Sequence, residues 1–323
     1  MHARLIVYAL TALLFVTAHP TLAQPYPSKT IRFVIGYPTG GGVDFTARPI
    51  AQKLSERWGQ SVIVDSRPGG SAMIATDIVA KSAPDGYTVL VSASSEVSMN
   101  VALFKKMPYD PVRDLQPVTL VGSTPPLLLS HPSLPVKSAK ELIAFARARP
   151  GVLSYASIGV GTPQHFAGEL IKSTFRIDMV HVPYKGAAPA LIDMVGGHVP
   201  IGIVAPTVAV PHVKAGRLRA LAVTSAQRSP SMPAVPTMAE SGAPGFDIVQ
   251  WYAVWLPAKT PRDIVDKLHA EIVRIIQSPE NRQRQLEVAT DVIGTSPEAL
   301  AEFQKNEIAK YRKIAAAAGI APE

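Results

Sequence analysis

The stretch VIGYPTGGGVDFTARPIAQKLSERWG, residues 34–59, places three consecutive glycines between a short apolar run and a helical pattern. From Asp44 onward, apolar residues recur at helical spacing, and Gly59 supplies the stop signal expected at a helix C-terminus. The apolar face consists of Ala47, Ile50, Ala51, Leu54 and Trp58. A strand, a glycine turn and a helix in this order begin a βαβ unit. Whether the turn binds a ligand or is only a tight corner depends on what the fold places beside it.

The residues that follow continue the same alternation. Continuous apolar runs at 61–66 and 87–93 predict strands that are buried on both faces, as in parallel sheets. A second helix is expected from about Ser71 until just before Pro84. Residues 31–93 therefore predict a βαβαβ half of a doubly wound domain.

A second series of this kind begins near residue 138. We expect helices at 138–149, 165–176, 189–196 and 208–215, and strands at 153–158, 179–184, 201–205 and 218–225. Extended apolar segments, 118–132 and 246–261, connect the two series, and the chain is helical again after them. The expected fold is α/β with two lobes, each a doubly wound sheet, joined by two hinge-crossing strands. Lobe 1 would contain 24–125 and 251–323, including the C-terminal helices, and lobe 2 would contain 126–250.

The N-terminus reads as a cleavable secretory signal peptide, residues 1–23. Arg4 precedes an uncharged, mostly apolar run, and Thr21 and Ala23 are the small residues of a cleavage site. The alternative, a membrane anchor, is disfavoured because the run is shorter than the ~20 residues needed to span a bilayer. We expect a mature protein beginning at Gln24 in the periplasm of a Gram-negative bacterium.

The amino-acid composition excludes several classes of function and disfavours others. The 323-residue chain has no cysteine, which excludes disulfides, thiol catalysis and thiolate metal sites. The net charge of +8 is scattered and aromatic residues make up only 7%, so nucleic-acid binding has little support, whereas small anions remain suitable ligands. The histidines are isolated, so no metal and no cofactor are expected.

Four loops stand where ligands bind in doubly wound sheets, beyond the carboxyl ends of strands. They are PTGGGVD (38–44), RPGGSA (67–72), GVGTPQ (159–164) and KGAAPA (185–190). A helix N-terminus offers unpaired N–H groups and a partial positive charge, and glycine allows an anion to approach the backbone closely. A plain turn explains any one loop by itself. Four loops at one topological position predict a carboxylate site instead.

Other chemistries are less well supported by these loops. The glycines at 40–42 are not followed by Gly-Lys-Ser/Thr, and Gln164 stands where a dinucleotide fingerprint needs its last glycine. Ser157, His165 and Asp44 are the residue types of a catalytic triad, but the serine lacks the G-x-S-x-G context. His165 is expected to be a first-turn helix residue.

Several longer motifs resemble the Bug/TctC family, the periplasmic solute-binding receptors of tripartite tricarboxylate transporters. The motifs include GYPTGGGVDFTAR, RPGGSAMIATDIVAKSAPDGYTVL, ASIGVGTPQHFAGEL and HVPYKGAAPALIDMVGGHV, and the resemblance covers essentially the whole mature chain. It implies a periplasmic binding protein of the Venus-flytrap type, similar to type II, in which backbone groups and ordered water hold carboxylates. The binding positions that it implies are Tyr37, Thr39, Gly40, Gly41, Gly42, Asp44, Gly69, Gly70, Ser71, Ser157, Gly159, Gly161, Thr162, His165, Tyr184, Lys185, Gly186 and Ala205. For Asp44, capping of its own helix is the alternative to ligand contact.

Some positions depart from the family pattern. The family often has asparagine at Asp65 or Ser66 and glycine at Ala75, and it commonly has aspartates where this chain has Pro200, Val204 and Ala205. The second-lobe wall should therefore be more apolar and less acidic than usual. An amine-bearing ligand would lack its counter-charge, so a simple, aromatic or hydroxylated carboxylate is favoured.

The function expected from the sequence is that of an extracytoplasmic receptor, monomeric and without catalytic activity. It would capture a small carboxylate, such as a di- or tricarboxylate or an aromatic acid, and deliver it to the permease subunits of a tripartite tricarboxylate-type transporter. The alternatives are a periplasmic ligand sensor for a signalling partner and a secreted serine hydrolase using Ser157 and His165.

Overall fold

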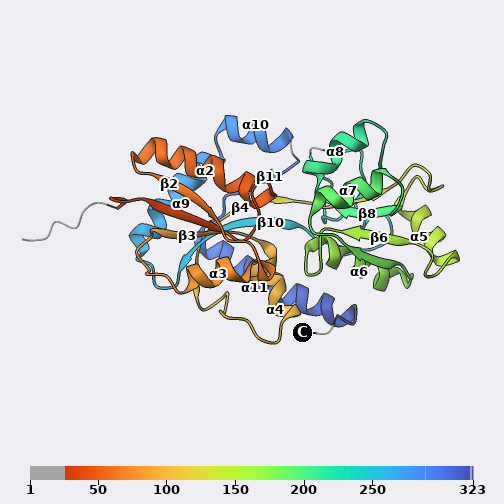
Figure 1. Cartoon of the computed structure of the whole chain (residues 1–323), viewed down its shortest axis with the longest axis horizontal. Helices are drawn as coiled ribbons and strands as arrows, with labels where there is room; N and C mark the ends of the chain where they lie inside the picture. The colour runs from red at the N-terminus through yellow and green to blue at the C-terminus, as the bar shows by residue number, and fades with distance from the viewer. Residues whose placement is uncertain (1–25, 231, 288, 321, 323) are drawn as a thin grey trace, which may run out of the picture.

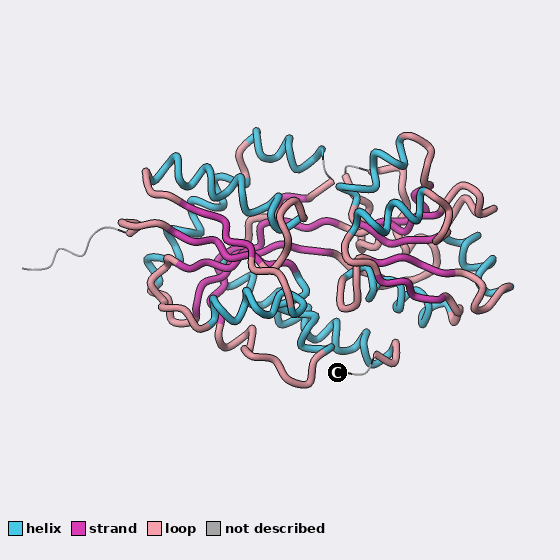
Figure 2. Tube along the Cα trace, viewed as in Figure 1, coloured by secondary structure: helices cyan, strands magenta, loops and turns pink. Residues whose placement is uncertain are grey.

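The computed structural model describes residues 26–230, 232–287, 289–320 and 322, and the expected signal peptide lies outside these ranges. Two β-sheets lie next to each other along the long axis of the molecule, and helices cover both (Figure 1). The secondary-structure view shows the strands of each sheet enclosed between helices (Figure 2). This arrangement confirms the two-lobed α/β fold expected from the sequence.

The first sheet has six strands in the order β11-β4-β10-β3-β1-β2. Its strands are β1 (Ile31–Ile35), β2 (Val62–Ser66), β3 (Thr88–Ala93), β4 (Leu115–Thr124), β10 (Gln250–Pro257) and β11 (Asp291–Val292). Strand β1 is parallel to β2 and β3, whereas β10 is antiparallel to β3 and β4. Alternate side chains enter different cores: Phe33 packs in one with α2 and α9, and Val34 packs in another with α3 and α11. The helices of this part are α2 (Gly42–Trp58), α3 (Met73–Ala80), α9 (Arg262–Ile276), α10 (Pro279–Glu287) and α11 (Pro297–Ala317).

The second sheet has five strands in the order β7-β6-β8-β5-β9. They are β5 (Leu127–Ser130), β6 (Ser154–Ser157), β7 (Val180–Pro183), β8 (Ile201–Val204) and β9 (Arg219–Val223). Strand β6 is parallel to β7 and β8, and β5 is antiparallel to β8 and β9. The helices α5 (Ala139–Ala148), α6 (Pro163–Phe175), α7 (Ala187–Val195) and α8 (Pro206–Lys214) each overlap the residues predicted for them. Because every parallel strand leads into a helix, the helix N-termini gather at the carboxyl edges of the sheets.

The chain crosses between the sheets as extended backbone. Strand β4 ends at Thr124 in the first sheet, and after two prolines β5 begins at Leu127 in the second. Strand β10 brings the chain back to the first sheet. Proline lacks an N–H, so Pro125 and Pro126 end the pairing of β4 at the crossing point.

Two helix starts differ from the prediction. Helix α2 begins at Gly42, two residues before Asp44, because Gly41 already has the extended backbone of an N-cap. The helix expected from Ser71 begins only at Met73, after a one-turn 3-10 helix, η1 (Gly70–Ala72), in which Ser71 and Ala72 are left-handed. Ala72 packs tightly against β1: a Cβ at Gly36 would lie 2.4 Å from the Ala72 Cβ. This close approach leaves no room for a side chain at position 36.

The sequence analysis missed the helical segment that follows β3. It consists of a π-helical turn, η2 (Ser95–Met99), and α4 (Asn100–Leu103). All five residues of η2 are buried. The run SSEVSMN contains too few apolar residues to produce a periodic signal.

Helix α11 contributes side chains to cores beside both sheets. Its first turns pack against the first sheet, where Leu300 lies in one core with Trp251 of β10. Its last turns contribute Tyr311 and Ile314 to the core that contains Phe166 of α6. The rings of Phe166 and Tyr311 meet edge to face with centroids 5.2 Å apart. The C-terminal end of α11 accordingly extends toward the second sheet (Figure 1).

We predict that Tyr311→Ala lowers the free energy of unfolding by about 3–5 kcal/mol, because it empties a fully buried site shared by both halves. The neighbouring substitution Lys313→Ala, at an exposed position, should change it by less than about 0.5 kcal/mol. Chemical denaturation followed by circular dichroism measures both values. Equal values for the two variants would show that the end of α11 contributes no packing energy.

Candidate functional site

The candidate residues lie at the carboxyl ends of strands β1, β2, β6, β7 and β8, and neighbouring loops contact each other within each sheet. In the first sheet, the Ser66 hydroxyl donates a hydrogen bond to the carbonyl oxygen of Tyr37 at 2.6 Å. In the second, the Tyr184 N–H donates to the Ser157 carbonyl at 3.0 Å. The four loops thus form two contiguous pairs, one on each sheet.

A chain of polar side chains links the two sheets next to these loops. The Gln164 amide of α6 donates to Gln250 Oε1 of β10 at 3.2 Å, and the Gln250 amide donates to the Tyr252 hydroxyl at 3.1 Å. That hydroxyl lies against the start of α2, since a Cβ at Gly42 would be 2.2 Å from it. On the other side, a Cβ at Gly161 would be 2.8 Å from Leu103 of α4. Loops of both sheets therefore come together around β10 and α4.

Four of the helix N-termini at the carboxyl edges of the sheets have no side-chain caps. Helices α2, α3, α7 and α8 begin after Gly41, Ala72, Gly186 and Ala205, and none of these receives a side-chain hydrogen bond. Among the helices that start elsewhere, the hydroxyls of Ser138 and Ser296 cap α5 and α11, whereas α9 begins after Pro261 without a side-chain cap. The first N–H groups of an uncapped helix lack intrahelical acceptors and carry the positive end of the dipole. Two such ends at the carboxyl edge of each sheet are each suited to an anion.

The loop after β6 differs because its amides are already satisfied. The N–H of Gly159 donates to Ser157 Oγ at 3.2 Å, and the N–H of Gly161 donates to His165 Nδ1 at 3.3 Å. Thr162 caps α6 by accepting from the His165 N–H. Ser157, Thr162 and His165 thus hold the loop's own backbone in place.

Three further candidate side chains also form hydrogen bonds or ion pairs within the protein. The Tyr37 hydroxyl donates to Glu96 Oε2 at 2.8 Å, and the Tyr184 hydroxyl donates to Asp193 Oδ2 at 2.6 Å. Asp44 accepts from the Gly40 N–H at 2.9 Å and pairs with Arg48. Burial raises the pKa of Asp44, but the hydrogen bonds from Arg48 and Gly40 outweigh it and leave the pKa below its usual value. Asp44 therefore stabilises the loop and the first turn of α2.

Thr39, Ser71 and Lys185 form a different group. All three are exposed, and within the described ranges their side chains have no hydrogen-bond or ion-pair partner. They are the candidate side chains most able to reach a bound molecule.

The triad alternative does not match the geometry. His165 lies in the first turn of α6, as expected, and Ser157 Oγ lies 2.7 Å from Nε2 of another histidine, His181. The His181 ring is stacked between Tyr155 and His165, with centroid distances of 4.9 and 4.5 Å. Burial, together with the adjacent His165, lowers the pKa of His181 to about 4. Ser157 is 0% exposed, so a nucleophilic role would require the loop to open.

Glu96 is the main site residue that the sequence analysis missed. It is 0% exposed, and it accepts hydrogen bonds from the Tyr37 hydroxyl and, at 2.9 Å, from the Ala93 N–H. Burial raises its pKa to about 7, although these hydrogen bonds favour the ionised form. The available signal was its position: the polar run at 94–100 follows β3 at the same sheet edge as the predicted loops.

Two buried amides near the loops were missed as well. The Asn100 side chain donates to the Ser71 carbonyl at 3.0 Å, which ties α4 to the loop after β2. Asn100 and Gln164 are both 0% exposed, and the side-chain carbonyl oxygen of each has no hydrogen-bond partner in the described structure. Unsatisfied buried acceptors are rare in native proteins.

Asp65, one of the positions noted above as departing from the family pattern, forms ion pairs with two arginines. Its carboxylate lies 3.5 Å from an Arg32 guanidinium nitrogen and 3.0 Å from Arg67 Nε. Arg32 lies in β1 and Arg67 directly follows β2, so two guanidinium groups pair with this acidic side chain. In the second sheet Val204 is fully buried, which leaves Ala205 as the residue at the end of β8.

Two sheets joined by crossing strands, with anion-attracting helix ends at their carboxyl edges, define a two-lobed solute-binding protein. A family model described as "Tripartite tricarboxylate transporter family receptor" (TctC) matches residues 46–320, and the chain belongs to this family.

Three known proteins show the extent of the similarity. Protein BugT of Bordetella pertussis is 38% identical over 299 residues, which cover 92% of this chain and 91% of BugT. The structure of R. palustris Rpa4515 with adipate is 37% identical, with a TM-score of 0.85, and covers 92% of this chain and 100% of that one. The structure of MatC from Rhodopseudomonas palustris with bound malate is 30% identical, with a TM-score of 0.80. The similarity covers 90% of this chain and 99% of that one.

We predict that Glu96→Gln gains stability relative to wild type as the pH rises. The native state holds the Glu96 proton more tightly than the unfolded chain, so it binds more protons between about pH 4.5 and pH 7. Wild-type stability attributable to this group is therefore full below that window and falls as the pH rises through it. Glutamine does not titrate, so the difference in unfolding free energy should shift in its favour by on the order of 2–3 kcal/mol.

Denaturant unfolding of both proteins at pH 5 and pH 8 measures this shift. Glu302→Gln, at an exposed position, is the control and should show no pH-dependent difference. A constant difference between Glu96→Gln and wild type would mean that Glu96 titrates normally.

Proposed function

We propose that this protein is an extracytoplasmic solute receptor that binds a small carboxylate between its two lobes and delivers it to the membrane component of a tripartite tricarboxylate-type transporter. The observation that carries the proposal is the set of four uncapped helix N-termini at the carboxyl ends of parallel strands, two in each sheet. Backbone N–H groups aligned with helix dipoles attract an anion without a dedicated cation.

The proposed ligand class is a small dicarboxylate or hydroxycarboxylate, with aromatic acids and tricarboxylates as further members. The adipate and malate of the two similar structures support it, because both molecules carry two carboxylates. The buried, unpartnered oxygens of Asn100 and Gln164 favour a ligand or bridging water that donates hydrogen bonds.

The proposed binding positions are those implied by the sequence, divided by role. The backbone around Gly41, Gly42, Gly69, Gly70 and Gly186, together with the Ala205 end of β8, provides donors, and Thr39, Ser71 and Lys185 reach the ligand from the rim. The other candidates, which include Tyr37, Asp44, Ser157, His165 and Tyr184, hold these loops in shape.

The moving parts in this proposal are residues 24–125 with 251–323 and residues 126–250. A ligand that touches loops of both parts has more contacts in the closed arrangement, and this difference shifts the population toward closure. Export through a cleaved signal peptide, a monomeric state and the lack of catalysis remain predictions. Within the described residues, no helix combines the length and apolar character required to cross a bilayer.

We predict that adipate or malate raises the melting temperature of the purified protein, whereas neutral sugars and nucleotides leave it unchanged. A ligand at one hundred times its Kd stabilises the native state by about 2.7 kcal/mol. Differential scanning fluorimetry over such a panel measures the shift. Stabilisation by sugars or nucleotides alone would contradict a carboxylate receptor.

We further predict that Gly41→Val weakens carboxylate binding at least tenfold while the protein remains folded. Gly41 has φ −82°, which any residue adopts, and the nearest atom to an added Cβ is the Pro38 carbonyl oxygen at 3.5 Å. The valine would cover the uncapped end of α2, where each charge-assisted hydrogen bond contributes about 1.5–3 kcal/mol.

Lys185→Met is the comparison variant for this experiment. An exposed lysine contributes about 0–1 kcal/mol, so its loss should weaken binding less than about fivefold. Calorimetric titration with adipate or malate, after circular dichroism has confirmed folding, compares the two variants. If Lys185→Met abolishes binding and Gly41→Val does not, a side-chain cation rather than the helix end holds the anion.

A further inference from the structure

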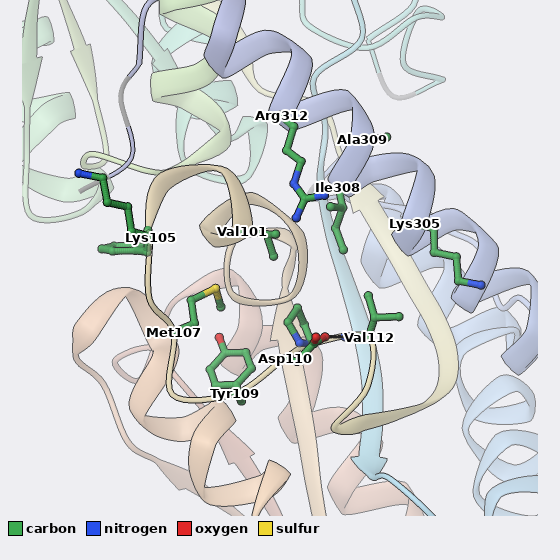
Figure 3. Close-up of a pocket in the computed structure, with 12 residues that line it drawn as sticks. Val101, Lys105, Met107, Tyr109, Asp110, Val112, Lys305, Ile308, Ala309 and Arg312 are labelled. Carbon is green, nitrogen blue, oxygen red and sulfur yellow. Dashed lines mark hydrogen bonds between the residues drawn. The ribbon is translucent and has the colours of Figure 1, made fainter.

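A concave region lies away from the candidate loops, between residues 101–112 and helix α11. It has a volume of about 510 Å³ and contains none of the candidate ligand residues. Its apolar surface is formed by Val101, Phe104 and Met107 on one side and Ile308 of α11 on the other (Figure 3). A volume of this size is typical of binding pockets.

The charges around this cavity are predominantly positive. The Arg312 guanidinium is directed into it, and Lys105 and Lys305 lie on opposite sides with their side chains pointing outward (Figure 3). Within the described residues, these three cations form no ion pair. The acidic residue at the cavity, Asp110, accepts from the N–H groups of Val112 at 2.9 Å and Arg113 at 3.1 Å, so its carboxylate is engaged in its own turn.

The walls of the cavity are fixed by buried hydrogen bonds. The Gln304 amide of α11, 3% exposed, donates to the carbonyl oxygens of Val97 at 3.0 Å and Pro111 at 3.1 Å. The Tyr109 hydroxyl donates to the Glu96 carbonyl at 2.7 Å. Both sides of the cavity are therefore attached to residues 95–103, which comprise η2 and α4.

The same residues 95–103 also contact the candidate ligand loops. The Glu96 carboxylate accepts from Tyr37, the Asn100 amide donates to Ser71, and Leu103 packs against Gly161. This short segment thus touches the proposed ligand loops of both sheets and also forms part of the cavity wall. A change in the position of Gly161 relative to Ser71 must be accommodated by residues 95–103, because interiors this tightly packed transmit displacement.

We propose that this cavity is a docking site for an acidic polypeptide segment with apolar side chains, carried by the membrane component of the transporter. The proposal rests on the receptor function proposed above. Charge complementarity indicates which partner fits. Arg312 would pair with an acidic side chain inside the cavity, and the apolar walls would pack against the apolar side chains on either side of it. A small anion would reach Arg312 alone, whereas a segment crossing the cavity also reaches the outward-pointing Lys105 and Lys305. Docking at this wall allows the membrane component to distinguish ligand-bound from empty receptor.

The test measures binding of the purified receptor to the purified membrane component in nanodiscs by biolayer interferometry, with and without adipate. Arg312→Glu and Lys305→Glu should each weaken docking at least tenfold. Lys313→Glu, on the same helix but outside the cavity lining, should bind within twofold of wild type. Higher salt should weaken wild-type docking, as expected for a contact between exposed charges.

Adipate binding to the receptor alone, measured by calorimetry, separates this proposal from the proposed function. If docking occurs through the cavity, Arg312→Glu leaves adipate affinity unchanged while docking is lost. The proposal would be overturned if Arg312→Glu and Lys305→Glu both docked as tightly as wild type. It would also be overturned if light scattering showed that wild type forms a dimer that these substitutions abolish, because the cavity would then bind a second receptor. If wild type binds none of the carboxylates in the panel, the proposed function fails, whatever the docking assay gives.

Discussion

The candidate site depends on a requirement of parallel sheets: each strand must be followed by a crossover, so successive helices begin at the same edge of the sheet. The first N–H groups of every such helix need acceptors from outside the helix. Helices α5 and α11, which begin elsewhere, obtain them from Ser138 and Ser296. Of the helices that begin beside the candidate loops and at the end of β8, only α6 has a side-chain cap, Thr162, and the N-termini of α2, α3, α7 and α8 remain available to an anion.

The loops differ in how many of their amides remain free. The N–H groups of Gly40, Gly159 and Gly161 already donate hydrogen bonds. Their acceptors are the side chains of Asp44, Ser157 and His165, respectively. These internal bonds give the loops a defined shape before any ligand binds, which lowers the entropic cost of binding. The residues that preorganise the loops thus differ from those proposed to contact the ligand, although both belong to the same short motifs.

Several elements connect the two sheets, and any change in the angle between the lobes must pass through them. The crossing strands supply the covalent links, and the Gln164–Gln250–Tyr252 chain supplies a polar one. The end of α11 shares a core with Phe166 and with Met99, Ala102 and Leu103. In the proposed closure, movement of the lobes would require this shared core to repack, next to both the candidate loops and the cavity.

The sequence by itself determined the alternation of strands and helices, apart from the helical residues 95–103, and it also determined the two-sheet fold and the position of the glycine loops at strand ends. Hydrophobic periodicity and glycine turns are local signals, and for this reason they could be read without a structure. Only the tertiary structure decided that Ser157 pairs with His181, that Glu96 is buried against Tyr37 and that the end of α11 joins the second core. These contacts join residues far apart in the chain or lying in polar runs without periodicity. Their partners are set by how the sheets and helices pack, and no local pattern encodes that packing.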